Sequence, residues 1–255
     1  MEKLKNKVAI VTGAASGMGK SIAELYAKEG ATVMLADYNI DGAQAVSEEL
    51  NSQGFTTKAV RVNVADAEDI NEMFRVTINS FGTYDILVNN AGVMDNFEPV
   101  GEVTDENWDR IFDINTKSVM RSMRQAVNYW LAEDKKGIIV NTISTGGLNG
   151  AHAGAVYGAS KHAVTALTKN TAFMYAQKGI RVNGIAPGAV ATNIQSSMTG
   201  KSELGLSRAR IAQSVTPRVG QAEDIGKVAV FLGSEDSDFV NGTVIVADAG
   251  WTAAF

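Results

Sequence analysis

The 255-residue sequence contains no cysteine and only two histidines, His152 and His162. The absence of cysteine excludes disulfides, thiolate nucleophiles and zinc–thiolate sites, and we expect no metal centre. A serine hydrolase would need a histidine base beside its nucleophile, and the sequence has no G-x-S-x-G motif to carry that nucleophile. The serine hydrolase class is therefore rejected.

Long apolar runs are also missing. No segment approaches the ~18 consecutive apolar residues of a membrane span, and the apolar segment after residues 1–7 is too short for a signal peptide. The formal net charge of −5 disfavours binding to nucleic acid or to anionic membranes. We expect a cytoplasmic protein whose partner is a small-molecule substrate, with neither nucleic acid nor membrane as a partner.

Short apolar runs alternate along the chain with segments of helical periodicity. Their continuous hydrophobicity is typical of parallel strands buried on both faces. The seven predicted strands cover residues 8–11, 32–37, 58–62, 85–88, 137–144, 180–186 and 243–248. With helices between them, the pattern predicts an α/β, single-domain Rossmann fold over residues 1–255, with a doubly wound seven-stranded parallel β-sheet flanked by helices. The alternation stops at 189–216, an amphipathic segment that we interpret as a substrate-binding lid.

A glycine-rich turn follows the first predicted strand and opens the first predicted helix. Gly13, Gly17 and Gly19 would let the backbone approach a pyrophosphate at the helix N-terminus. Asp37 ends the second strand about 20 residues further on, where a carboxylate can accept both ribose hydroxyls of NAD. It would repel a 2′-phosphate, and neutral Ser16 offers no basic partner for one. The alternative is that Asp37 is only a turn or capping acid.

Three polar side chains suggest proton-transfer chemistry. Tyr157 and Lys161 stand four residues apart on a predicted helix and so share one face. An ammonium group beside a phenol favours the phenolate, so we expect the pKa of Tyr157 to be lowered. The phenol could then give a proton to a carbonyl oxygen or take one from an alcohol. Ser144, at the end of the fifth strand, would hydrogen-bond the same oxygen.

These motifs together resemble the short-chain dehydrogenase/reductase family over essentially the whole chain. They are T-G-x-x-x-G-x-G at 12–19, N-N-A-G at 89–92, Asn115, Ser144 with Tyr157-x-x-x-Lys161, and P-G-x-x-x-T at 187–192. The resemblance implies that Tyr157 is the general acid/base, that Lys161 also binds the nicotinamide ribose, and that Asn115 holds a water linking Lys161 to solvent. Asn89, the first residue of the N-N-A-G motif, could have a purely structural role, tying neighbouring strands together, or it could contact a ligand.

The resemblance also implies NAD (NADH) as cofactor and a homotetramer in which the helix of Tyr157 packs against a neighbour's copy. At the adenine position the family often has Asp, and this chain has Asn63, whose amide oxygen can still accept a hydrogen bond. The implied cofactor contacts are Gly13, Ser16, Gly17, Met18, Gly19, Asp37, Asn63, Val64, Asn90, Ala91, Gly92, Tyr157, Lys161, Pro187, Gly188, Val190 and Thr192.

For the substrate, we predict a secondary alcohol and its ketone, of hydrophobic, cyclic or steroid-like character. The predicted pocket is largely apolar: Met94, Gly146, Leu148, His152, Met198, Leu204 and Leu206. His152 could equally be an ordinary loop residue. Within the family, a 3-oxoacyl-(acyl-carrier-protein) reductase and a sugar dehydrogenase stay open as alternatives. Outside it, the competitor is a non-catalytic nucleotide-binding protein, although Ser144, Tyr157 and Lys161 are all present.

Overall fold

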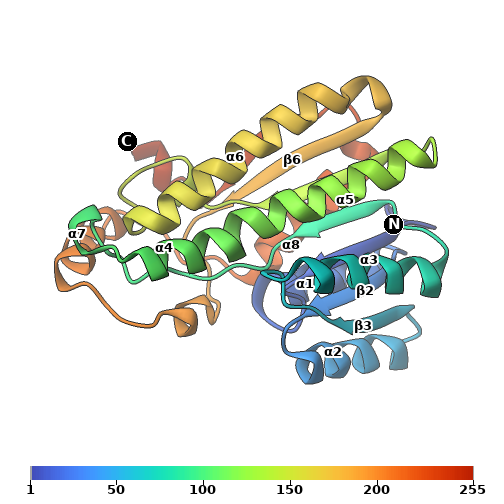
Figure 1. The fold of residues 1–255 in the computed structure, drawn as a ribbon, viewed down its shortest axis with the longest axis horizontal. Helices are drawn as coiled ribbons and strands as arrows, with labels where there is room; N and C mark the ends of the chain where they lie inside the picture. The colour runs from blue at the N-terminus through green and yellow to red at the C-terminus, as the bar shows by residue number, and fades with distance from the viewer. Residues whose placement is uncertain (1, 255) are drawn as a thin grey trace.

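The computed structural model describes residues 2–254. Seven parallel strands form one sheet in the order β3-β2-β1-β4-β5-β6-β7, with helices on both faces (Figure 1). The strands are β1 (Val8–Thr12), β2 (Thr32–Asp37), β3 (Thr57–Arg61), β4 (Ile86–Asn89), β5 (Gly137–Thr142), β6 (Ile180–Pro187) and β7 (Val244–Ala247). The predicted doubly wound Rossmann fold is confirmed, with strand ends shifted by one or two residues.

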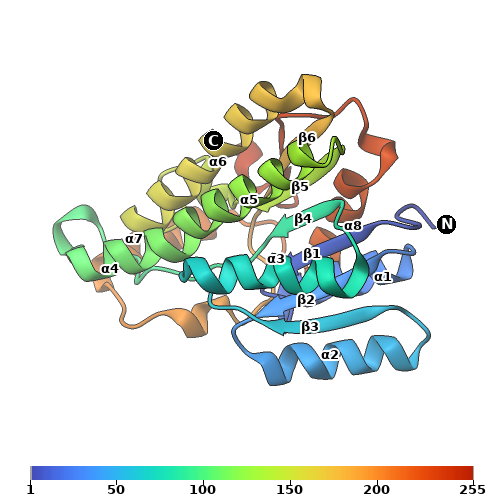
Figure 2. The same cartoon turned by 45° about the vertical axis from the view of Figure 1, so that its right-hand side comes forward.

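Two hydrophobic clusters lie on opposite faces of the sheet, because successive strand residues point in opposite directions. Ala9 and Val11 of β1 join the first cluster, under α1 (Gly17–Lys28), α2 (Ile40–Ser52) and α8 (Ala222–Gly233). Val8 and Ile10 join the second, under α3 (Ala67–Phe81), α5 (Ser118–Ala132) and α6 (Ala155–Tyr175) (Figure 2). Burial on both faces explains why the strands are continuous apolar runs.

Two helical predictions need correction. The helical pattern after Thr104 predicts one long helix that continues to about Leu131. The structure instead has α4 (Asp105–Phe112) and α5 joined by a π-helical turn, Asp113–Lys117. The inner stripe of α6 is Val156, Ser160, Val164, Thr168 and Ala172. The helical pattern of this segment predicts an inner stripe of Val164, Leu167, Thr171 and Met174, but Met174 is 63% exposed.

The strand order reverses between β1 and β4, which lie side by side although far apart in sequence. Open α/β sheets bind ligands at the carboxyl ends of such strands. Thr12 fastens the two ends together, because its Oγ1 accepts hydrogen bonds from the backbone N–H groups of Asn90 (3.0 Å) and Ala91 (3.1 Å). The same end of the molecule carries α7 (Glu203–Gln213) and the C-terminal turn Trp251–Ala254 (Figure 1).

No helix within residues 2–254 is long and apolar enough to cross a membrane.

Candidate active site

Two adjoining cavities open at the carboxyl ends of the strands. One, of about 560 Å³, is lined by the glycine turn, Asp37 and the loops after β3 and β4. The other, of about 400 Å³, is lined by Ser144, Tyr157 and Lys161 and by the 187–195 segment. Met18, Asn90, Gly92 and Thr192 line both, so the two form one continuous groove. A long ligand can therefore run from Asp37 to Tyr157.

The glycine turn is built for close packing. Gly13 and Gly17 have positive φ angles of 69° and 54°, which other residues adopt only with strain. Gly19 is packed so tightly that a Cβ atom there would lie 2.0 Å from the carbonyl oxygen of Gly13. The turn thus brings bare backbone and the first amides of α1 to the cavity, as a pyrophosphate requires.

Asp37 fits both interpretations of its role. Its carboxylate accepts hydrogen bonds from the backbone N–H of Ala15 (2.9 Å) and of Asn39 (2.8 Å), so it is a turn acid that braces the glycine turn. It also lines the larger cavity, and its two oxygens keep lone pairs for ribose hydroxyls. These features fit a bound dinucleotide.

The asparagine side chains near this cavity have different roles. Asn63 and Val64 line the larger cavity, and the amide oxygen of Asn63 also accepts from the Ala65 N–H at 3.1 Å. Asn89 is buried, and its Nδ2 donates to Asn141 Oδ1 at 2.9 Å across the sheet. The structural alternative for Asn89 is the one that the geometry favours.

Asn115 lies in the π-helical turn, fully buried. Its amide exchanges two 2.9 Å hydrogen bonds with the backbone N–H and C=O of Val93, and its Nδ2 also donates to Ser160 Oγ at 3.3 Å. A Cβ on Gly92 would lie 3.2 Å from Asn115 Oδ1 and 3.5 Å from Lys161 Nζ. Asn115 therefore fixes the loop after β4 next to the lysine.

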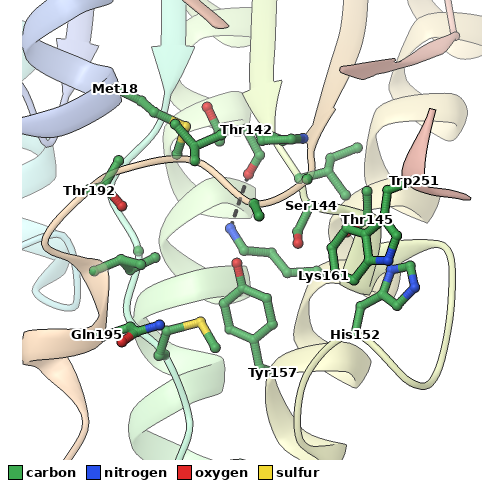
Figure 3. A pocket seen from close by; sticks show the side chains of 18 of the residues that line it. Met18, Thr142, Ser144, Thr145, His152, Tyr157, Lys161, Thr192, Gln195 and Trp251 are labelled. Atoms are coloured by element: carbon green, nitrogen blue, oxygen red, sulfur yellow. Dashed lines mark hydrogen bonds between the residues drawn. The ribbon is translucent and has the colours of Figure 1, made fainter. Parts of the chain in front are cut away.

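Ser144, Tyr157 and Lys161 converge on the smaller cavity, as Figure 3 shows. Ser144 lies two residues after β5, at the start of the turn Thr145–Gly147, and its Oγ accepts a hydrogen bond from the Gly146 N–H at 3.0 Å. Lys161 Nζ lies 5.7 Å from the centre of the Tyr157 ring and donates to the Thr142 carbonyl at 3.0 Å. Tyr157 is 6% exposed and Lys161 3% exposed.

Burial dominates the ionisation of this pair. It raises the pKa of Tyr157 to about 12, against a hydrogen bond with the Ser144 hydroxyl that lowers it. It lowers the pKa of Lys161 from 10.5 to about 8, because a desolvated ammonium is disfavoured. The prediction that the pKa of Tyr157 is lowered is therefore wrong for the protein alone. Desolvation of the phenolate exceeds the effect of the Ser144 hydrogen bond, and the Asp95 charge adds to the rise.

Asp95 is a buried carboxylate that belongs to none of the sequence motifs. Its Oδ2 accepts from the backbone N–H of Tyr157 at 2.9 Å, and its Oδ1 accepts from Phe97 (3.0 Å) and Gly154 (3.3 Å). Burial raises the pKa of Asp95, and the three N–H donors oppose that rise. Asp95 thus ties the loop after β4 to the first turn of the helix that carries Tyr157.

The predicted pocket residues are only partly brought together. Met94 and His152 line the smaller cavity, Met198 and Leu206 pack in a cluster with Met94 and Tyr157, and Gly146 lies against Tyr157 and Ser144. Leu204 is 56% exposed, and neither Leu204 nor Leu148 lines the cavity, so the structure does not bring these two residues to the predicted pocket. Lining residues that were not predicted are Thr142, Ile143, Thr145, Ala189, Ile194, Gln195, Gln213, Thr216, Val219 and Trp251.

Known proteins resemble this chain along nearly its whole length. Residues 13–252 match the family model described as Enoyl-(Acyl carrier protein) reductase. The chain is 41% identical over 250 residues to 3beta-hydroxysteroid dehydrogenase 2 of Eggerthella lenta, covering 98% of this chain and 96% of that protein. It is 37% identical over 251 residues to the cyclohexanol dehydrogenase of an Acinetobacter species, covering 98% and 97%.

Solved structures of similar proteins also match this chain along nearly its whole length. The crystal structure of levodione reductase superposes with a TM-score of 0.89 at 30% identity, covering 99% of this chain and 100% of that one. A Beutenbergia cavernae protein crystallised with NADP at low occupancy superposes with a TM-score of 0.87 at 33% identity, covering 99% of each. This chain belongs to the short-chain dehydrogenase/reductase family and is an oxidoreductase of the nicotinamide-dependent kind.

Proposed function

We propose that this protein interconverts a secondary alcohol and a ketone with NAD(H), with Tyr157 as the general acid/base. The observation that carries the proposal is the buried Tyr157–Lys161 pair, with Ser144, at the wall of a cavity continuous with the dinucleotide groove. The nicotinamide supplies or accepts the hydride. The protein's share is to orient the substrate oxygen and to move its proton.

Each side chain has a defined part in that proton transfer. Ser144 Oγ hydrogen-bonds the substrate oxygen next to Tyr157. A phenol with a pKa of about 12 is neutral near pH 7 and can donate its proton to a ketone oxygen during reduction. In alcohol oxidation the phenolate is needed, and the charge of Lys161 then favours it. Asn115 holds the loop after β4, and with it Gly92, against Lys161.

Tyr157→Phe tests this role directly. Turnover of every ketone should fall by at least about a thousandfold, in keeping with the loss of a positioned general acid, while NADH binding should stay within about twofold. Tyr175→Phe, at the far end of α6, is the matched control and should keep its activity. Substantial turnover by Tyr157→Phe would rule out the assigned role.

Asp37 supports a preference for NAD over NADP. Its carboxylate would repel a 2′-phosphate, whereas the nearby Arg61 is engaged with the Tyr38 ring (5.0 Å) and with Asp69 (3.7 Å). Asp37→Asn keeps an acceptor for the Ala15 N–H and removes the charge. We expect Asp37→Asn to lower the ratio of kcat/KM with NADH to kcat/KM with NADPH by about tenfold or more, which corresponds to about 1.4 kcal/mol. An unchanged ratio would refute this function of the carboxylate.

We propose an apolar ring compound as the substrate, held under a lid formed by residues 189–216. Two relatives are named for cyclohexanol and for a 3beta-hydroxysteroid, and the cavity beside Tyr157 is lined by Met94, Ile194 and Trp251. Hydrogen bonds join the lid to the loop after β4. Asn96 Oδ1 accepts hydrogen bonds from the backbone N–H groups of Thr199 (3.0 Å) and Gly200 (2.8 Å). A screen of NADH oxidation over cyclic, acyclic and steroid ketones tests the substrate class.

The description of the matching family model favours one alternative, an acyl-carrier-protein substrate. Arg208 and Arg210 are exposed on α7 and could contact an acidic carrier protein. A 3-oxoacyl thioester belongs in the same screen, and its preferential reduction would replace the ring-compound proposal. Preferential oxidation of a sugar alcohol would do the same.

We also propose a homotetramer in which α6 packs against a neighbour's copy. Phe173 and Met174 on α6, and Phe239 before β7, are large apolar side chains exposed in the single chain. Light scattering should give about four times the 27.0 kDa chain mass. A monomer would contradict this assembly.

A further inference from the structure

The last turn of the chain forms part of the substrate cavity. Trp251 is only 4% exposed and lines the same cavity as Ser144 and Tyr157. Its ring stacks on His152, with the ring centres 4.1 Å apart and the planes inclined by 12° (Figure 3). The two residues are 99 positions apart in the sequence, which indicates a surface assembled by the fold.

The indole is held from several sides. Its Nε1 donates to the Ala212 carbonyl of α7 at 2.7 Å. The Asp248 carboxylate accepts from the backbone N–H of Gly250 (2.9 Å) and of Thr252 (2.7 Å), which fixes the turn that carries Trp251. A Cβ atom on Gly188 would lie 3.4 Å from Trp251 Cε3, so the indole also rests on the loop after β6. A side chain held in this way can act as a fixed wall.

The position of the His152–Trp251 pair relative to the reacting groups determines which part of a bound substrate the pair can contact. In Figure 3, His152 and Trp251 lie on the Ser144 side of Tyr157, whereas Met18 and Thr192 lie on the other side. Met18 and Thr192 also line the dinucleotide cavity. A substrate whose oxygen reaches Ser144 and Tyr157 therefore has the nucleotide on one side and the His152–Trp251 pair on the other.

The pair is flat and mainly apolar. Burial lowers the pKa of His152, against the Asp248 charge, so the imidazole is neutral near pH 7. Stacked neutral rings favour contact with a compact carbocycle through dispersion and burial of apolar area. A flexible chain gains less from such a wall, because it loses rotamer freedom on being held against it.

We propose that Trp251, stacked on His152, is the specificity-determining surface against which the ring of the substrate lies. The inference rests on the proposed ketone–alcohol function and specifies its substrate class as carbocyclic. It also makes ring selection a property of the last turn of the chain, supported by α7.

The test compares cyclohexanone with 2-hexanone, two ketones with six carbons each. Trp251→Ala should raise KM for cyclohexanone about tenfold, the size expected when an aromatic contact and its apolar area are lost. KM for 2-hexanone should change by less than about threefold, and NADH affinity should stay within about twofold. Trp251→Phe should keep most of the ring preference, and Trp108→Ala, on α4 and outside the cavity lining, is the matched control.

The outcomes separate this inference from the function on which it rests. Equal effects of Trp251→Ala on both ketones, or no effect on either, would overturn the role of Trp251 while leaving the enzyme class intact. If Trp251→Ala does not fold, His152→Ala decides, because it should also lower the preference for the ring by several-fold; an unchanged preference would overturn the proposal. Wild-type protein that binds NADH but reduces no ketone would overturn both.

Discussion

Replacement of Lys161 by methionine should stabilise the protein at neutral pH while removing its activity. Lys161 is buried, and its Nζ donates a hydrogen bond to the Thr142 carbonyl. Desolvation lowers its pKa from 10.5 to about 8. Methionine has a similar length and carries no charge, so it removes the buried ammonium without leaving a large void.

The sign and size follow from proton linkage. Folding favours the neutral amine, so between about pH 8 and pH 10.5 the unfolded chain binds more protons and the stability contributed by Lys161 rises with pH. Below pH 8 both states hold the proton, and the full penalty of about 3 kcal/mol remains, at about 1.4 kcal/mol per pKa unit. Losing the hydrogen bond to Thr142 offsets about 1 kcal/mol. Lys161→Met should therefore gain about 2 kcal/mol at pH 7.

Urea unfolding at fixed protein concentration, from pH 6.5 to pH 9.5, measures this difference. The advantage of Lys161→Met should be constant up to about pH 8 and then shrink by about 1.4 kcal/mol per pH unit. Lys169→Met, at an exposed position of the same helix, should change stability by less than about 0.5 kcal/mol at any pH. A Lys161→Met protein less stable than the wild type at pH 7, or an advantage independent of pH, would refute the reasoning.

Three further changes have defined outcomes. Gly19→Ala would place its Cβ 2.0 Å from the Gly13 carbonyl oxygen. In a fluorescence titration, NADH affinity should therefore fall at least about tenfold, or about 1.4 kcal/mol. An unchanged affinity would contradict the tight packing of the glycine turn. Ketone reduction should slow above about pH 8 as Lys161 loses its proton, and Lys161→Arg should extend the plateau of the pH–rate profile; a wild-type profile flat to pH 10 would oppose this. The Asp95 charge raises the pKa of Tyr157, so Asp95→Asn should move the acid limb of alcohol oxidation to lower pH, whereas a purely structural carboxylate would leave that limb in place.

The sheet and the catalytic residues could be predicted from sequence for a physical reason. Strands buried on both faces must be apolar throughout, and runs such as 8–11 and 32–37 show this without any knowledge of their partners. Motif residues such as Ser144 and Tyr157 follow directly from those strands or from the helix next in sequence. The order of strands and helices along the chain therefore determines that these residues meet at the same end of the sheet.

Features that depend on distant burial could not be predicted. The spacing of Tyr157 and Lys161 indicated one charge next to a phenol, but the larger effect on the pKa of Tyr157 is desolvation by the surrounding fold. Trp251 shows no periodic pattern, and its partner His152 lies in a loop about a hundred residues earlier. The exposure of Leu204 and Met174 likewise depends on how their helices pack in the folded chain, which the local apolar pattern does not determine.

The π-helical turn at Asp113–Lys117 makes the joined helices α4 and α5 sensitive to length. Each residue advances an α-helix by about 100° and 1.5 Å, and a π turn accommodates one residue more than an α turn. Deletion of one residue there would allow an unbroken α-helix with α4 and α5 still in phase, but it would remove the widened turn from which the Asn115 amide reaches Val93. An insertion or deletion elsewhere in α4 or α5 would instead rotate one helix by about 100° relative to the other. We expect this helix to tolerate substitutions on its exposed side far better than any insertion or deletion between Asp105 and Ala132.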